Sequence, residues 1–199
     1  MCQYDSLNIA IFGGTFDPIH QAHIAVARAA RDRFALDRVL LIPNAVPPHK
    51  QGSLGASFEE RLEMVRLACE GETAMEASAL EQGTARSYSA DTIAKVRASL
   101  TPRDRLFFVI GADAFAEIGT WYRTAEVLAA VDFIVVARPG HTFATPAGAR
   151  VYPLDSVHLD VSSSDIREKL AQGEPPPDLA PAVFDYIRAH RLYGFGTAR

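Results

Sequence analysis

The stretch Gly13-Gly14-Thr15-Phe16-Asp17-Pro18-Ile19-His20-Gln21-Ala22-His23 holds the strongest information about the fold. Residues 7–12 before it are almost continuously apolar, which is typical of a strand buried on both faces. Residues 24–30 after it are rich in good helix formers. The sequence therefore predicts a strand, a glycine turn and a helix. In an open parallel sheet, such a junction lies at the carboxyl end of a strand, where ligands bind.

The same stretch has the chemistry of a phosphate site. Gly13 and Gly14 allow the backbone to approach a ligand closely, and the N-terminus of the following helix favours an anion. His20 and His23 are three residues apart, so they share one face at the start of that helix. We predict a phosphate-binding turn that carries two imidazoles.

Other interpretations of these histidines remain open. His20, His23 and Asp17 could form a metal site, because imidazoles and a carboxylate can bind zinc, but neither an HExxH pattern nor a cysteine ligand set accompanies them. Both histidines could instead pack in the core, which their position after two glycines disfavours. A P-loop and a dinucleotide-binding loop are disfavoured, since neither G-x-x-x-x-G-K-[ST] nor G-x-G-x-x-G is present.

Length and composition indicate a single globular domain over residues 1–199, with 48% hydrophobic and 22% charged residues. The net charge of −4 disfavours a nucleic-acid or anionic-membrane binder. Two cysteines provide no disulfide framework. The N-terminus lacks a signal-peptide pattern, and no apolar run reaches about 18 residues. We expect a soluble cytoplasmic protein; the sequence leaves open whether it forms a homo-oligomer.

Strand-like and helix-like segments alternate along the chain. This alternation predicts an α/β fold with a doubly wound, mainly parallel sheet and helices on both faces. A small helical portion from about residue 162 follows the sheet. Residues 141–149 are expected to form a loop. Further strands are expected at residues 38–43, 73–80, 106–110, 133–137 and 157–159, and helices at 58–69, 89–100, 124–131 and 180–189.

Several strand ends carry candidate ligand groups. Lys50 lies in the loop that follows the second strand, where composition alone favours a solvated loop equally. Gly111 and Asp113 follow the strongest strand and could form a ribose-binding corner, with close backbone approach and a hydroxyl acceptor; Asp113 could instead cap a helix. Arg138 places a positive charge at the end of residues 133–137.

Aromatic and serine-rich segments complete the candidates. Trp121, the only tryptophan, precedes Tyr122 and has no apolar flank, so we expect an exposed aromatic surface that stacks on a heteroaromatic ring. A core tryptophan is the alternative. Ser89 is a plausible helix cap. Residues 162–164 are serines that can cap a helix and bind phosphate, and an Arg167 in its first turn would be favourable if an anion lay between.

These motifs together resemble the nucleotidylyltransferase superfamily, whose short signature is (H/T)-x-G-H. The longer form in residues 13–20 resembles the bacterial nicotinate mononucleotide adenylyltransferases, with Ala22 in place of the usual glycine, a change expected to tune affinity. Pro47-Pro48-His49-Lys50, the segment 161–167 and Leu192-Tyr193 extend the resemblance from about Ile9 to Tyr193.

The resemblance implies a Rossmann-like nucleotidylyltransferase fold whose C-terminal portion completes the ATP site. It implies adenylyl transfer from ATP to nicotinate mononucleotide in NAD biosynthesis, with Mg²⁺ carried by ATP and no metal site on the protein. The implied catalytic residues are His20, His23 and Arg167. The implied ATP-binding residues are Gly13, Gly14, Thr15, Phe16, His20, His23, Gly111, Asp113, Ser163, Ser164, Ile166 and Arg167. The implied acceptor-binding residues are Lys50, Ser89, Trp121, Tyr122 and Arg138, with the tryptophan over the pyridine ring.

Alternative functions also fit parts of the pattern. The acceptor could be nicotinamide mononucleotide or phosphopantetheine. A non-catalytic nucleotide sensor on the same fold normally loses the histidine pair, which is retained here. A phosphohydrolase lacks support, because neither a nucleophile with a base nor a carboxylate metal cluster is evident.

Overall fold

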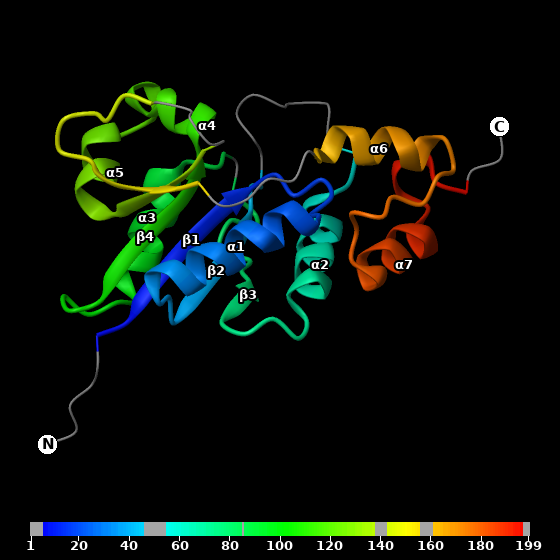
Figure 1. Ribbon diagram of the computed structural model, residues 1–199, viewed down its shortest axis with the longest axis horizontal. Helices are drawn as coiled ribbons and strands as arrows, with labels where there is room; N and C mark the ends of the chain where they lie inside the picture. Colours follow the sequence, from blue (N-terminus) through cyan, green and yellow to red (C-terminus); the bar gives the residue numbers. More distant parts are fainter. Residues whose placement is uncertain (1–5, 46–54, 85, 138–142, 156–160, 197–199) are drawn as a thin grey trace, which may run out of the picture.

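The computed structural model describes residues 6–45, 55–84, 86–137, 143–155 and 161–196. Its centre is a six-stranded sheet in the order β3-β2-β1-β4-β5-β6, and every neighbouring pair is parallel (Figure 1). The predicted α/β fold is therefore confirmed. The strands are β1 Asn8–Gly14, β2 Arg38–Pro43, β3 Met75–Ala77, β4 Arg105–Gly111, β5 Asp132–Val136 and β6 Arg150–Leu154.

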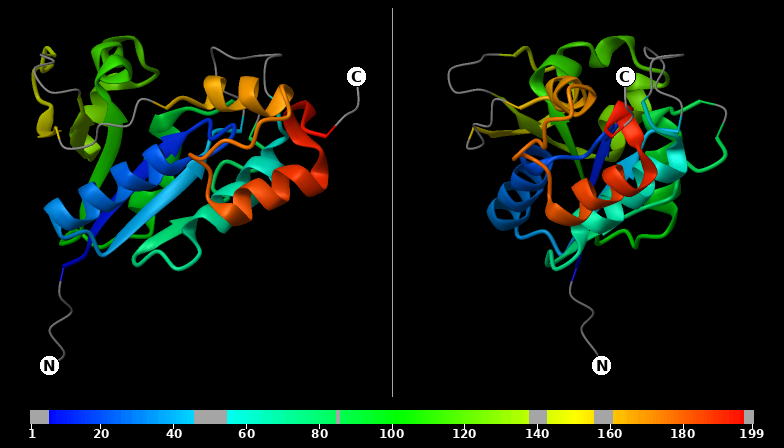
Figure 2. Two further views of the ribbon diagram at one scale, coloured as in Figure 1. Left: turned by 45° about the vertical axis from the view of Figure 1, so that its right-hand side comes forward. Right: turned by 90° about the vertical axis from the view of Figure 1, so that its right-hand side faces the viewer.

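Helices cover both faces of this sheet. One apolar cluster joins the sheet to α1, α2, α6 and α7, and the other joins it to α3, α4 and α5. Figure 2 shows α6 and α7 together at the end of the molecule opposite the N-terminus. The helices are α1 Gln21–Phe34, α2 Phe58–Cys69, α3 Ser89–Ala98, α4 Ala112–Ala116, α5 Thr124–Ala130, α6 Ser163–Ala171 and α7 Pro181–His190, with 3₁₀ turns η1 Ile118–Thr120 and η2 Leu192–Gly194.

The apolar run in β1 follows from this two-sided burial. Successive side chains of a strand point to opposite faces. Accordingly, Ala10 and Phe12 belong to one cluster, whereas Ile9 and Ile11 belong to the other. A central strand of this kind has no polar face, which explains why the sequence shows no alternation there.

The edge strands differ from the predictions. β3 spans only Met75–Ala77, within the longer segment predicted. β6 at Arg150–Leu154 was not predicted, because most of its residues are exposed or half-buried and it contains Pro153, a residue tolerated mainly at sheet edges. The strand predicted at residues 157–159 lies outside the described part of the chain.

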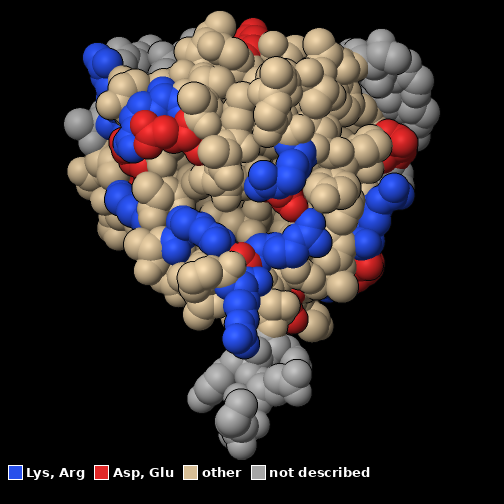
Figure 3. All heavy atoms as spheres, turned by 90° about the vertical axis from the view of Figure 1, so that its left-hand side faces the viewer, with Lys and Arg blue, Asp and Glu red and all other residues tan. Residues whose placement is uncertain are grey.

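The amino-terminal edge of the sheet carries basic side chains that pair with acids. Arg38, Arg105 and Arg150 are the first residues of β2, β4 and β6. Arg38 pairs with Glu76, and the other two share Asp132. Figure 3 shows blue and red side chains interspersed on the face seen from the left of Figure 1. Among the described residues, no helix is long and apolar enough to cross a membrane.

Candidate active site

The turn between β1 and α1 lies at the carboxyl edge of the sheet. β1 ends at Gly14, and α1 begins at Gln21 after the extended residue His20, its N-cap. The predicted strand, turn and helix are therefore confirmed. His23 is the third residue of the helix, so both imidazoles lie at the helix N-terminus, where the backbone favours negative charge.

The carbonyl groups of this turn, residues 14–18, are held by donors from other parts of the chain. The bonds to the oxygens of Gly14, Thr15, Asp17 and Pro18 come respectively from the Asn44 N–H (2.8 Å), Arg61 Nη1 (2.7 Å), Arg167 Nη1 (2.7 Å) and Ser163 Oγ (3.0 Å). Meanwhile the N–H groups of Thr15 and Phe16 donate to no acceptor among the described residues. Neighbouring free N–H groups form a favourable environment for an anion.

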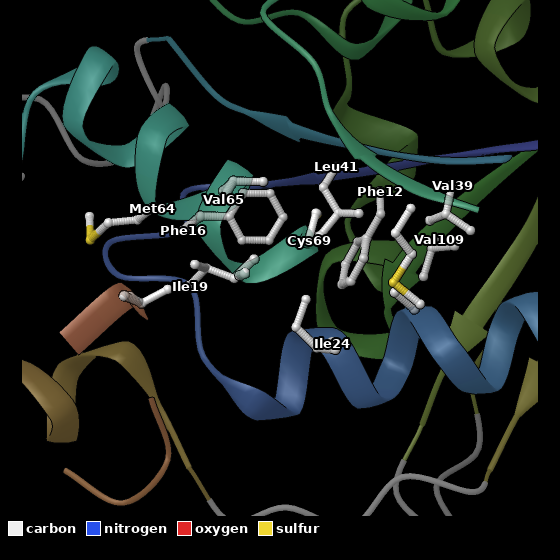
Figure 4. Packing of buried hydrophobic residues seen from close by; sticks show 14 of the residues in the cluster. Phe12, Phe16, Ile19, Ile24, Val39, Leu41, Met64, Val65, Cys69 and Val109 are labelled. Atoms are coloured by element: carbon white, nitrogen blue, oxygen red, sulfur yellow. The ribbon is translucent and has the colours of Figure 1, made fainter. Parts of the chain in front are cut away.

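Phe16 anchors the turn in the core. Its side chain is 1% exposed and lies against Met64 and Val65 of α2 (Figure 4). A Cβ on Gly14 would come within 2.8 Å of the Phe16 ring, so the glycine makes room for the phenyl ring, and its predicted contact with ATP stays a prediction. Phe16 also has a left-handed backbone, with φ of 50°. Only its backbone remains to meet a nucleotide, since the ring is packed away.

The two imidazoles lie against each other, with their ring planes tilted by 35°. Their ring centroids are 3.8 Å apart, and the His20 N–H donates to Nδ1 of His23 at 3.3 Å. That bond leaves the proton of a neutral His23 on Nε2, which can then donate to a phosphate. His20 is buried and its Nδ1 has no partner among the described residues.

Burial makes both histidines neutral at pH 7. Desolvation lowers the pKa of His20 to about 4, opposed by the charge of Asp178. Desolvation also lowers the pKa of His23 well below 6.5, and the neighbouring His20 lowers it further. Each ring therefore provides one N–H donor.

Asp17 has a tethering role that disfavours the zinc interpretation. Its buried carboxylate accepts the Tyr193 hydroxyl at 2.8 Å and the Gly55 N–H at 2.9 Å, one on each oxygen. Burial, together with Asp17, raises the pKa of Tyr193, so the phenol remains a donor. Within the ranges described by the structure, no group of three or more His, Cys, Asp and Glu side chains is placed to hold a metal.

The start of α6 contacts the turn through Ser163 and Arg167. Ser162 caps the helix by accepting the Asp165 N–H at 3.2 Å, as the serine run predicted. The guanidinium of Arg167 reaches back towards Ser164 and the Asp17 carbonyl. Arg167 is the fifth residue of the helix and so lies beyond the first turn, contrary to the prediction.

Ile166 is a correction. Its side chain is completely buried in the core, and its N–H donates to the Ser162 carbonyl within the helix. Its side chain is therefore not available to ATP. The motif has an apolar residue at this position because the side chain packs in the core.

A cavity of about 490 Å³ opens beside the turn, between β1, β4, Asn44 and the start of α3. It is lined by six of the predicted site residues: Gly13, Thr15, Ser89, Gly111, Trp121 and Tyr122. The imidazoles, the α6 serines and Arg167 are not among the residues that line this cavity, although they lie at the same turn. Gly13 and Thr15 therefore connect two neighbouring sites.

The aromatic wall of this cavity consists of Tyr88, Trp121 and Tyr122. Trp121 is half-buried, with its ring at 76° to that of Phe108 and the ring centroids 6.0 Å apart, so the indole is less exposed than predicted. Phe108 comes from β4 and supplies the apolar contact that the local sequence lacks. Tyr122 is 54% exposed and packs against Tyr88 at 4.7 Å.

The N-terminus of α3 also borders the cavity. Tyr88 is its N-cap and makes no side-chain capping bond, so Ser89 is the first helical residue and not the cap that we predicted. The N–H groups of Asp91 and Thr92 donate to the Tyr88 carbonyl. The N–H groups of the first two residues of a helix have no acceptor within it, so they are available to a ligand.

Comparisons with known proteins agree with this geometry. Residues 11–169 match the cytidylyltransferase-like family. A protein of Solibacter usitatus named "Probable nicotinate-nucleotide adenylyltransferase" is 57% identical over 187 residues, covering 94% of this chain and 100% of the relative. A relative of the same name from Geobacter sp. strain M21 is 41% identical over 213 residues, covering 94% and 98%. The chain belongs to the nicotinate-nucleotide adenylyltransferase family.

Solved structures support the fold of this adenylyltransferase. Plasmodium falciparum nicotinic acid mononucleotide adenylyltransferase, complexed with APC, superposes with a TM-score of 0.77 at 22% identity, over 96% of this chain and 100% of that one. The same enzyme complexed with NaAD gives a TM-score of 0.76.

One predicted residue, Asp113, stays apart from the observed clusters. Asp113 is exposed in the first turn of α4, whose N-cap is Gly111, and it is not among the residues that line the cavity. It is therefore not a helix cap, and its contact with ribose stays a prediction. Lys50 and Arg138 lie outside the described residues.

Sequence reasoning missed the buried polar residues that support the adenylyltransferase site. Arg61 and Glu81 are both buried, and each makes a hydrogen bond to the backbone of Ala45. Asn44 lines the cavity and binds the turn through its N–H. The only local sign that Arg61 is buried is its position on the apolar side of α2, next to Leu62.

Proposed function

We propose that the protein transfers the adenylyl group of ATP to nicotinate mononucleotide, giving nicotinate adenine dinucleotide and pyrophosphate in NAD biosynthesis. One observation carries this proposal: the phosphate turn with its two adjacent imidazoles shares Gly13 and Thr15 with an aromatic cavity. A triphosphate on one side and an aromatic mononucleotide on the other would bring two phosphates together at the turn.

The reaction needs no general base. An oxygen of the acceptor phosphate attacks the α-phosphorus of ATP, and the bond between that phosphorus and the bridging oxygen breaks, releasing pyrophosphate. The second pKa of a phosphate monoester is about 6, so the attacking group is already ionised at neutral pH. Catalysis then depends on positioning and on stabilising charge in the transition state.

The donors available on the ATP side match that requirement. His23 Nε2, His20 and Arg167 supply hydrogen bonds to the phosphates, and the N-termini of α1 and α6 supply favourable dipoles. We assign the N–H groups of Thr15 and Phe16, the hydroxyls of Ser163 and Ser164, and the portion from about residue 162 to this ATP site. Magnesium arrives on the ATP phosphates as part of the substrate, since it keeps several waters.

The acceptor side matches a pyridine carboxylate. Trp121 offers an aromatic ring for stacking, and the first N–H groups of α3 offer donors. A carboxylate accepts hydrogen bonds only, whereas an amide also brings an NH₂ that needs an acceptor. A site formed of donors therefore favours the acid. Lys50 and Arg138 remain proposed acceptor contacts.

We further propose that the enzyme acts in the cytoplasm, where its nucleotide substrates occur. Cys69 is a free and buried thiol, which is compatible with a reducing compartment.

The decisive experiment measures products. With ATP, Mg²⁺ and nicotinate mononucleotide, the purified protein should form dinucleotide and pyrophosphate in equal amounts. Parallel reactions with nicotinamide mononucleotide and phosphopantetheine test the alternative acceptors. Phosphate or AMP as the main product, without dinucleotide, would contradict adenylyl transfer and favour a hydrolase.

A further inference from the structure

Arg61 is a buried cation with no role in the reaction described above. It lies in the first part of α2, and its side chain is among the largest that are completely buried. Burial lowers its pKa, while the charge of Asp17 opposes that change. Arginine nevertheless stays protonated in proteins. Burying a charge costs several kcal/mol unless partners compensate, so an arginine here is a poor choice for packing alone.

The contacts of Arg61 join two walls of the site. Nη1 donates to the Thr15 carbonyl at 2.7 Å, in the phosphate turn, and Nη2 donates to the Ala45 carbonyl at 3.4 Å, just after β2. Thr15 and Asn44, the neighbour of Ala45, both line the cavity. The guanidinium carbon lies 5.7 Å from the Phe58 ring centroid, and Nε has no partner among the described residues. The planar guanidinium thus sets the distance between the backbone at Thr15 and the backbone at Ala45.

Glu81 holds the same peptide segment from the other direction. Its buried carboxylate accepts the Ala45 N–H at 3.2 Å and the Thr92 hydroxyl at 2.7 Å. Thr92 is in the first turns of α3, the helix whose N-terminus borders the cavity. A continuous series of hydrogen bonds therefore runs from the phosphate turn through Arg61, Ala45 and Glu81 to the acceptor side.

We propose that Arg61 is a positioning residue that, with Glu81 and through Ala45, fixes the phosphate turn relative to the acceptor wall. The inference rests on the proposed function, because it concerns the alignment of the acceptor phosphate with the α-phosphorus. Neither side chain touches a substrate. A displacement of about 1 Å between reacting groups can reduce the rate about 10²-fold, so such a tether would act on kcat.

The test separates alignment from binding and from folding. Arg61→Met keeps an unbranched side chain of similar length but removes all donors. We expect kcat to fall about 10²-fold, with KM for ATP and for nicotinate mononucleotide changed by less than about threefold. Arg61→Lys can still donate to one carbonyl and should recover part of the loss. The matched control is Arg66→Met on the same helix, because Arg66 is exposed and pairs only with Glu63 among the described residues; its kcat should be normal.

A second variant keeps the inference testable if Arg61→Met does not fold. Glu81→Gln preserves the shape of the side chain but removes its charge and replaces one of its two accepting oxygens by an NH₂ donor. One of the two hydrogen bonds remains possible, so this variant should lower kcat less than Arg61→Met does. If both residues act through Ala45, the combined loss in Arg61→Lys/Glu81→Gln should be smaller than the product of the single losses. The melting temperature of each variant shows at which assay temperatures it is folded.

The outcomes are distinguishable. Failure of the wild-type protein to form dinucleotide in the same assay would overturn the proposed function and this inference with it. Wild-type activity combined with a normal kcat in folded Arg61→Met, or in folded Arg61→Lys and Glu81→Gln together, would overturn the inference alone. A fall in Tm with unchanged kcat would assign Arg61 a purely structural role.

Discussion

The two sides of the site are built in opposite ways. The turn between β1 and α1, residues 14–18, is buried and tethered, with four of its carbonyls held by donors from separate segments and Phe16 only 1% exposed. The aromatic wall is supported mainly by ring contacts, and Tyr122 is 54% exposed. Surface arginines flank its tyrosines: Arg86 donates to the Tyr88 hydroxyl, and Arg123 lies over the Tyr122 ring.

The turn is therefore preorganised, whereas the aromatic wall can adapt to its ligand. Donors fixed before the substrate arrives can stabilise a transition state without reorganising. Exposed rings, by contrast, gain much of their burial only when a ligand covers them. Substitutions in the turn should therefore act on kcat, and substitutions in the wall should act on acceptor KM.

The largest effect should come from removing a fixed donor. His23→Ala should lower kcat by about 10²–10³, because one preorganised donor to the developing charge is lost. Steady-state kinetics with both substrates saturating measure the change. His190→Ala, at an exposed histidine of α7, is the control and should be normal. A normal kcat in His23→Ala would remove the imidazole from the mechanism, and copurifying zinc would restore the metal interpretation.

The buried imidazoles should also make stability depend on pH. His20 has a pKa near 4 when folded and about 6.5 when unfolded, so between these values the unfolded chain binds more protons. Stability should therefore fall as pH decreases from about 6.5 to about 4, by up to about 3 kcal/mol for this residue. The free energy of unfolding, measured with denaturant across that pH range, should depend less steeply on pH in His20→Asn than in wild type. An equal slope in the two proteins would contradict the burial argument.

Acceptor choice is the next largest effect and tests the wall. We expect kcat/KM for nicotinate mononucleotide to exceed that for nicotinamide mononucleotide by at least about 10²-fold, or about 2.7 kcal/mol. A buried NH₂ that faces N–H groups costs about 1–3 kcal/mol, and bonds to a charged acid are stronger. Competition between the two acceptors at limiting ATP gives the ratio directly. Comparable values would refute the acid preference while leaving adenylyl transfer intact.

The smallest effect concerns stacking. Trp121→Ala should raise the acceptor KM about tenfold, since stacking contributes about 0.5–1.5 kcal/mol beyond area burial. ATP binding should change little, because Trp121 lines the cavity, whereas the imidazoles and Arg167 do not. Trp121→Phe is the matched variant and should recover most of the affinity. An equal loss for ATP and acceptor would mean that the indole supports the whole site through Phe108.

The sequence predicted the parts of the site that are local in the chain. The strand, the glycine turn and the histidine pair fall within residues 8–23, where the structure depends mainly on residues that are neighbours in the sequence. The helix cap at Ser162 was predictable for the same reason. The sheet followed from the alternation of apolar strands and helices, except at its half-exposed edge strand β6.

Long-range contacts could not be predicted from the sequence in this way. The bond from Arg61 to Thr15 spans 46 residues, and the position of Arg61 on the apolar side of α2 does not indicate this partner. Trp121 was misjudged because its partner, Phe108, comes from a strand. Ile166 was assigned to ATP because it belongs to a motif, although its side chain packs in the core.

The bond between Asp17 and Tyr193 has a consequence for synthesis. The two residues are 176 positions apart, and a ribosome adds about 5–20 residues per second, so roughly 9–35 s separate the making of the two partners. A nascent chain therefore presents its first motif without the hydroxyl that holds the Asp17 carboxylate. The tether of Asp17 is therefore completed only by η2, which is synthesised after all six strands of the sheet.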